Sequence, residues 1–193
     1  PIAAGAVSLQ VLDARGGPAR GAVAFVSAGD RQGILMRDSL VRVPLDERGA
    51  AALRLVPGRW VFVVVTQEGF GARSVDLGAD DAEVEVRLAL QPLARTVVTL
   101  RDAAGRPVEG ARLRSRGTTT RGTNDPVLSI LQGLRRASHV HWERLRTDVE
   151  GRVAIPFVPV EGLEQRLDLR WDGRESEPFA LEPDAEIVVG ETR

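Results

Sequence analysis

The chain has 193 residues, 43% of them hydrophobic, and a formal net charge of −1, so it can bury a core and carries no global field that would recruit nucleic acid. It contains no cysteine, which excludes disulfides, thiolate metal sites and a cysteine nucleophile. All 26 basic residues are arginine, and without lysine the chain can form neither a Schiff base nor a Lys–Asn isopeptide bond.

The chain has no obvious targeting or membrane segment. No apolar run approaches the ~20 residues that a transmembrane helix requires, so we expect no membrane insertion. The sequence begins at Pro1 without a basic leader, which is typical of a processed or excised piece. This favours an extracellular, cell-surface or periplasmic location.

The first predicted elements are two strands around a turn. Val7, Leu9 and Val11 alternate with polar residues, as in a half-buried strand. The stretch "DARGGPARGA", residues 13–22, follows as a Gly- and Pro-rich turn, and "AVAFVSA" then predicts a return strand and hence a hairpin. Further on, an acidic turn in "LDERGAAALRL" precedes the strands "VFVVVTQEGF" and "DAEVEV".

The second half repeats these elements in the same order. "DAAGRPVEGA" begins at Asp102, 89 positions after its counterpart at Asp13, and "TDVEGRVAIPF", "RLDLRWDGRE" and "DAEIVV" follow. The spacing reaches 103 at the last match, so the second copy has gained about 14 residues. Ordered matches of this kind indicate a tandem duplication. They predict one β-sandwich over residues 1–91 and another over residues 92–193.

The extra residues of the second copy, at about 118–138, predict a short helix within "TNDPVLSILQGLRR". Asn124 or Asp125 would cap it and Pro126 would start it. Such a helix either covers its own sandwich or contacts a partner or a neighbouring copy. The candidate partner-binding residues are its apolar stripe and basic end, Val127, Ile130, Leu131, Leu134, Arg135 and Arg136.

The repeated motif resembles the carboxypeptidase regulatory-like domain, a prealbumin-like (transthyretin-like) sandwich. The Asp-x-x-Gly-x-Pro-x-x-Gly-Ala turn carries the resemblance, with Thr147, Asp148 and Gly151 before a central strand and Gly58-Arg59-Trp60 in the first copy. The expected fold is therefore all-β, with two tandem seven-stranded sandwiches and a short helix inserted in the second. The resemblance implies a non-catalytic accessory module that serves as a spacer, stabiliser or docking unit.

The sharpest chemical candidate is "HVHWE". In a strand, His139, His141 and Glu143 would share one face, and two histidines with a carboxylate can bind iron or zinc. The alternative is an exposed strand face with two ordinary histidines.

Charge and aromatic residues leave two further alternatives open. Residues 106–146 hold nine arginines and three acids, whereas residues 147–192 hold four arginines and twelve acids. Arg112, Arg114 and Arg116 alternate, so they would either pair with acids across one sheet or polarise a module that stacks head to tail. Trp142 is the candidate for carbohydrate binding.

The leading hypothesis is a non-catalytic extracellular or cell-envelope module that acts in protein–protein contact, assembly, spacing or adhesion. Its partners would be other protein domains or copies of itself, with no nucleic acid and no cofactor. The alternatives are a metal-binding protein or metal-dependent enzyme using His139, His141 and Glu143, and a carbohydrate-binding module.

Overall fold

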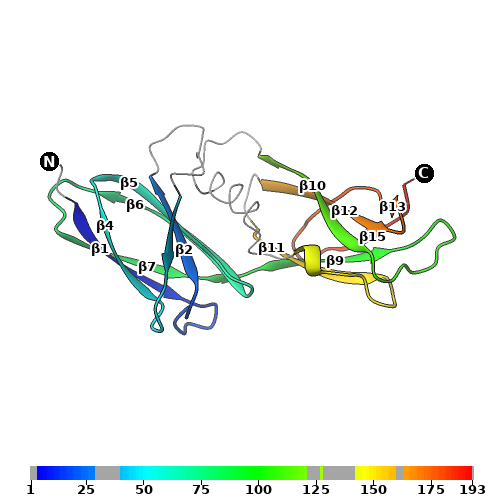
Figure 1. Ribbon diagram of the computed structural model, residues 1–193, viewed down its shortest axis with the longest axis horizontal. Coiled ribbons are helices and arrows are strands. Elements are labelled where there is room, and N and C mark those ends of the chain that lie inside the picture. Colours follow the sequence, from blue (N-terminus) through cyan, green and yellow to red (C-terminus); the bar gives the residue numbers. More distant parts are fainter. Residues whose placement is uncertain (1–3, 29–39, 121–126, 128–141, 160–162, 193) are drawn as a thin grey trace. The chain divides into compact units, whose positions relative to one another are not determined.

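The chain is all-β in the computed structural model, which describes residues 4–28, 40–120, 127, 142–159 and 163–192 (Figure 1). The described strands fall into two compact units, one ending at Pro92 and the other beginning at Leu93. In the predicted helical insertion, Val127 is helical, and residues 121–126 and 128–141 lie outside the described residues. Within the described part of the chain, no helix is long and apolar enough to cross a bilayer.

The first unit is a sandwich of two sheets. A three-stranded sheet has the order β4-β1-β7, and a five-stranded sheet has the order β3-β2-β5-β6-β8. Apolar side chains from both sheets, such as Leu9 and Phe62, form one buried core. The strands are β1 (Gly5–Leu12), β2 (Val23–Ala28), β3 (Val41–Pro44), β4 (Ala50–Leu55), β5 (Gly58–Val65), β6 (Gly69–Leu77), β7 (Glu83–Ala89) and β8 (Gln91–Pro92).

The second unit has the same arrangement. Its three-stranded sheet has the order β11-β9-β15, and in its four-stranded sheet β10 pairs with β12, which also pairs with β13 and β14. Leu100, Ile155 and Leu169 belong to its core. Its elements are β9 (Ala94–Leu100), β10 (Arg112–Thr120), the 3-10 helix η2 (Trp142–Arg144), β11 (Arg152–Phe157), β12 (Leu163–Trp171), β13 (Arg174–Glu175), β14 (Phe179–Ala180) and β15 (Glu186–Val189).

The two small sheets share their strand directions. β1 runs antiparallel to β4 and parallel to β7, and β9 runs antiparallel to β11 and parallel to β15. β15 pairs Ile187 with Val98, whereas β7 pairs Val86 with Leu9. The last strands therefore match at a spacing of 101 rather than the 103 of the letter match. A shift of two residues leaves every side chain on its original face.

The repeated sequence motifs form the same aspartate turn at four places in the chain. In each turn an aspartate Oδ1 accepts hydrogen bonds from the backbone N–H groups two and four residues ahead, at 2.8–2.9 Å. This local bonding by a short acidic side chain stabilises a tight turn without help from the core. The four aspartates are Asp13, Asp46, Asp102 and Asp148.

Glycine is required in the second of these turns in each unit, where the turn contacts the first strand of that unit. Gly49 and Gly151 have φ of +69° and +76°, a region that other residues enter at a cost. A Cβ on either would lie 2.5 Å from a strand carbonyl, that of Val11 or Leu100. The N–H groups of Val11 and Leu100 donate to the carbonyls of Gly49 and Gly151 at 2.8 Å. The preserved glycines therefore let the second turn of each unit pack directly on its first strand.

The predicted hairpin at the start of each copy is wrong. β1 and β2 lie in different sheets, and around the turn only Leu12 and Pro18 form an isolated bridge. The turn ends with Gly21 at φ +62°, where the chain leaves for the other sheet. Arg101 and Pro107 form the equivalent bridge in the second unit. A tight turn fixes only its own ends, and the sandwich core decides where the next strand goes.

Candidate contact surface on the second unit

The outer face of the larger sheet in the second unit is rich in arginine. In β10, Leu113 faces the core, so its neighbours Arg112 and Arg114 face outward. In β12, Leu167 and Leu169 face the core. Their neighbours therefore point outward as well. We define the arginine face as Arg112, Arg114, Arg116 and Arg170.

A β-bulge interrupts the predicted alternation of the arginines. The register of β10 against β12 shifts between Ser115 and Gly117, so Arg116 is an extra residue without a direct partner across the strand. Its guanidinium reaches two carboxylates on the outer face, with Nε on Asp168 Oδ2 and Nη2 at 2.7 Å from Glu175 Oε1. The simple period-two prediction for Arg112, Arg114 and Arg116 is corrected accordingly.

Asp168 is the most unusual group of this network. Its side chain is fully buried, and its Oδ1 has no hydrogen-bond partner in the described part of the chain. Burial disfavours the ionised form and raises the pKa of Asp168, against the opposing effect of Arg116. Arg116 has the same effect on its other partner, where it prevails over burial: its hydrogen bond lowers the pKa of Glu175.

Three arginines stand directly opposite one another across the edge of this sheet. Arg112 pairs with Arg170 in the β10–β12 register and with Arg146 in an isolated bridge. Like charges in direct opposition destabilise a sheet. Arg170 is neutralised by Glu175, whose Oε2 lies 2.8 Å from Arg170 Nη2. Among the described residues, no carboxylate lies within ion-pair distance of Arg112.

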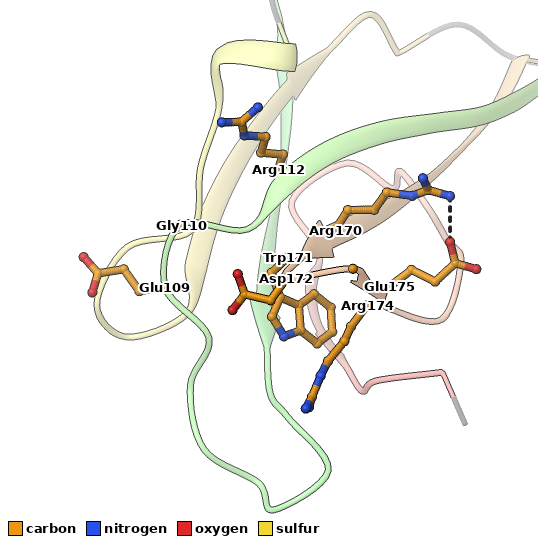
Figure 2. A pocket seen from close by; sticks show the side chains of 9 residues that line it. Glu109, Gly110, Arg112, Arg170, Trp171, Asp172, Arg174 and Glu175 are labelled. Atoms are coloured by element: carbon orange, nitrogen blue, oxygen red, sulfur yellow. Dashed lines mark hydrogen bonds and ion pairs between the residues drawn. The ribbon is translucent and has the colours of Figure 1, made fainter.

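Arg112, Arg170 and Glu175 line an open pocket of about 500 Å³, together with the acids Glu109 and Asp172 (Figure 2). Figure 2 shows the guanidinium groups of Arg112 and Arg170 pointing away from each other, as expected for like charges. Arg174 and Trp171 also line the pocket, and Arg174 Nη1 lies 3.1 Å from Glu191 Oε2 outside it. Splayed guanidiniums suit a partner that brings several separate carboxylates, because each can form charge-assisted hydrogen bonds.

The equivalent positions on the larger sheet of the first unit are apolar, and Arg42 of β3 lies over the Phe25 ring with its Cζ 5.8 Å from the centroid. Phe25, Val61 and Val63 alternate with the core residues of β2 and β5, and all three have 0% exposure. Phe25 pairs with Val63 across the strands. In the second unit, Arg114 and Asp168 form the equivalent pair. The charged outer face is therefore a property of the second unit and not of the fold.

The predicted metal site is only partly covered by the described residues. His139 and His141 lie outside them, and Glu143 lies in the 3-10 helix η2 rather than in a strand. The predicted strand over "HVHWE" therefore does not extend to Glu143, and a metal site at these residues stays a prediction. Among the described residues, no group of three His, Cys, Asp or Glu could hold a metal ion.

The other predicted site residues have different outcomes. Of the proposed partner-binding stripe, Val127 is half-buried, and Ile130, Leu131, Leu134, Arg135 and Arg136 lie outside the described residues. The Trp142 indole packs against the second core and donates its Nε1–H to the Pro156 carbonyl at 2.7 Å. Its role is structural, so nothing here favours it as a carbohydrate platform.

The carboxylates beside the arginine face were not predicted from the sequence. Asp168 and Arg170 alternate with Leu167 and Leu169 in "RLDLRW", and this period-two pattern predicts a charged outer face opposite a buried one. Glu175 carries no such signal, because it reaches Arg116 and Arg170 only through the pairing of β13 with β12.

No protein-family model and no curated protein matches the chain. Among solved structures, it is similar to a streptococcal ancillary pilin, with 13% identity, a TM-score of 0.46 and coverage of 98% of this chain and 62% of that one. The shaft pilin SpaA from Lactobacillus rhamnosus GG has 12% identity, a TM-score of 0.40 and 97% coverage of both chains.

A DUF3823 family protein from Parabacteroides merdae covers 100% of both chains with 10% identity and a TM-score of 0.34. Because each of these three TM-scores is below 0.5, we carry no activity and no partner over from these structures.

Proposed function

We propose that this chain is a non-catalytic β-sandwich module of an extracellular or cell-envelope protein, and that it works by protein–protein contact in assembly, spacing or adhesion. The arginine face is the contact surface. The observation that carries the proposal is the uncompensated Arg112, which stands between Arg146 and Arg170 in direct cross-strand register. A carboxylate from a partner would supply the missing counter-charge.

The fold itself does not need these arginines. The first unit builds the same sheet with Phe25 and Val63 in the positions of Arg114 and Asp168. Arg112 lies opposite two other arginines in this sheet, and a carboxylate of an acidic partner would neutralise it. Arginine is also more frequent in protein–protein interfaces than on the rest of the protein surface.

The absence of lysine allows a direct test. In an Arg112→Lys variant, the introduced amine is the only side-chain amine of the chain, and a carbodiimide couples an amine only to a carboxylate in contact with it. The variant is treated with carbodiimide in the presence of proteins from the cell envelope of the source organism, and coupled peptides are identified by mass spectrometry. We expect coupling to one acidic segment, suppressed by excess unmodified chain.

Arg95→Lys is the matched control, because Arg95 is also exposed in the second unit but belongs to the smaller sheet. It should couple weakly and without preference. Equal coupling by both variants would refute the arginine face as the contact surface, and hydrolytic or oxidative turnover by the purified chain would refute a non-catalytic role.

A further inference from the structure

An acidic edge of the first unit matches the arginine face in chemistry. Residues 80–85 contain Asp80, Asp81, Glu83 and Glu85 and no basic residue, and all four acids are exposed. Glu83 and Glu85 lie on β7, which is an edge strand of its sheet in the described chain. Val84 and Val86 belong to the core side of this strand, so both glutamates face outward.

The spacing of the charges matches as well. Arg112 and Arg114 are two residues apart on one face of β10, and Glu83 and Glu85 are two residues apart on one face of β7. In an extended strand this separation is ~6.5–7 Å. Two carboxylates of one strand can therefore meet two guanidiniums of the other at the same time.

The existing partners of these groups do not compete strongly. Glu85 Oε1 lies 2.8 Å from Arg87 Nε, but both side chains are more than half exposed, and such surface pairs contribute little. Glu83 has no ion-pair partner among the described residues. Acids within the arginine face, such as Asp168 and Glu175, disfavour a dense polyanion and favour a peptide with a few separate carboxylates.

We propose that the arginine face of one copy of this chain binds the acidic edge of β7 in a second copy, so that copies associate head to tail. This inference rests on the proposed function of the arginine face as a protein contact surface and names its partner. The two surfaces are different, so the contact is heterologous, and a pair of bound copies still has one free surface of each kind. An open chain of copies is the result.

Two charge-reversal variants test the proposal with the full chain. Arg112→Glu/Arg114→Glu removes the arginine surface, and Glu83→Arg/Glu85→Arg removes the acidic edge. All four side chains are exposed, so both variants should keep the β-sheet circular dichroism signal of the parent. Sedimentation velocity at low salt should show concentration-dependent association of the parent and at least about tenfold weaker association of each variant.

The decisive experiment is an equimolar mixture of the two variants. The native arginine face of one variant meets the native acidic edge of the other, and the two reversed surfaces are complementary as well, so the mixture should regain the head-to-tail assembly that each variant alone has lost. Raising the salt concentration to 0.5 M should dissociate it, because screening weakens exposed charge pairs. Arg95→Glu is the control that reverses an exposed arginine on the smaller sheet, and it should associate as the parent does.

The outcomes separate this inference from the proposed function. If the parent chain stays monomeric up to about 0.5 mM at low salt, or if the acidic-edge variant associates like the parent, the head-to-tail inference is wrong. If the Arg112→Lys amine then still couples to an acidic segment of another protein, the proposed function stands with a different partner. If that coupling shows no preference, both proposals fail.

Discussion

The larger sheets of the two units can be compared position by position. Phe25 pairs with Val63 on the outer face of the first, and Arg114 pairs with Asp168 on the outer face of the second. One residue earlier, the inward pairs are both apolar, Ala24 with Val64 and Leu113 with Leu169. The inner face of each strand is fixed by the core that it shares with the small sheet. The outer face is not fixed in this way, and it is apolar at Phe25 and Val63 but charged at Arg114 and Asp168.

The largest difference between the two faces should appear in the free energy of unfolding. Phe25 is fully buried, so Phe25→Ala should destabilise the first unit by about 3–5 kcal/mol through lost burial and an unfilled cavity. Arg114 is exposed, so Arg114→Ala should change stability by less than about 0.5 kcal/mol. Calorimetric unfolding of both variants measures this. Equal effects would show that the two faces are not as different as their exposure indicates.

The shared turns should respond alike in both units. Gly49→Ala and Gly151→Ala each place a Cβ 2.5 Å from a strand carbonyl at positive φ, so each should cost about 2–4 kcal/mol. Gly105 also has positive φ, but nothing lies within 4 Å of its Cβ position. Gly105→Ala should therefore cost only about 1 kcal/mol. A tolerated Gly151→Ala would mean that the packing of the turn on its strand is not needed.

A smaller effect is expected at Thr147, which occupies the position of Leu45 in the first unit. Both residues donate their backbone N–H to the carbonyl of an equivalent alanine, Ala22 or Ala111. Thr147 Oγ1 also accepts from Ala111 N at 2.9 Å and donates to Val108 O at 2.7 Å. Thr147→Val should cost about 1–3 kcal/mol, because it leaves these buried groups unpaired. Thr147→Ser retains the hydroxyl and should recover most of this loss in denaturant unfolding.

The smallest expected effect is a pair of opposite pH dependences within the arginine face. The folded-state pKa of Asp168 is raised, so its ionisation lowers stability as pH rises above its ordinary 3.8. The folded-state pKa of Glu175 is lowered, so its contribution is present above its ordinary 4.5 and is lost as pH falls below it.

Asp168→Asn should therefore gain stability relative to the parent as pH increases from 3.8. Glu175→Gln should be less stable than the parent above pH 4.5, where Glu175 of the parent is ionised, and this difference should shrink as pH falls below 4.5. Urea unfolding between about pH 3 and 7 compares the three proteins. The stability difference from the parent should depend on pH in opposite ways in the two variants. The same pH dependence in both would contradict the environments assigned to the two carboxylates.

The sequence by itself determined the all-β class and the turn chemistry. Alternation around Leu9, and the Asp–Gly turns at Asp13 and Asp102, depend only on local backbone bonding and on the period-two geometry of strands. Such features need no information about distant residues. The ordered repeat of these letters predicts a tandem duplication, and the two three-stranded sheets have equivalent strand orders.

The tertiary structure alone decided the rest. It placed β1 and β2 in different sheets, introduced the bulge at Arg116, and brought Glu175 beside Arg116 and Arg170. Which sheet a strand joins, and which charges then meet, depend on burial of the whole core and on contacts between residues far apart in the chain. The uncompensated position of Arg112 follows from that pairing, because only the register of β10 against β12 sets it opposite Arg170.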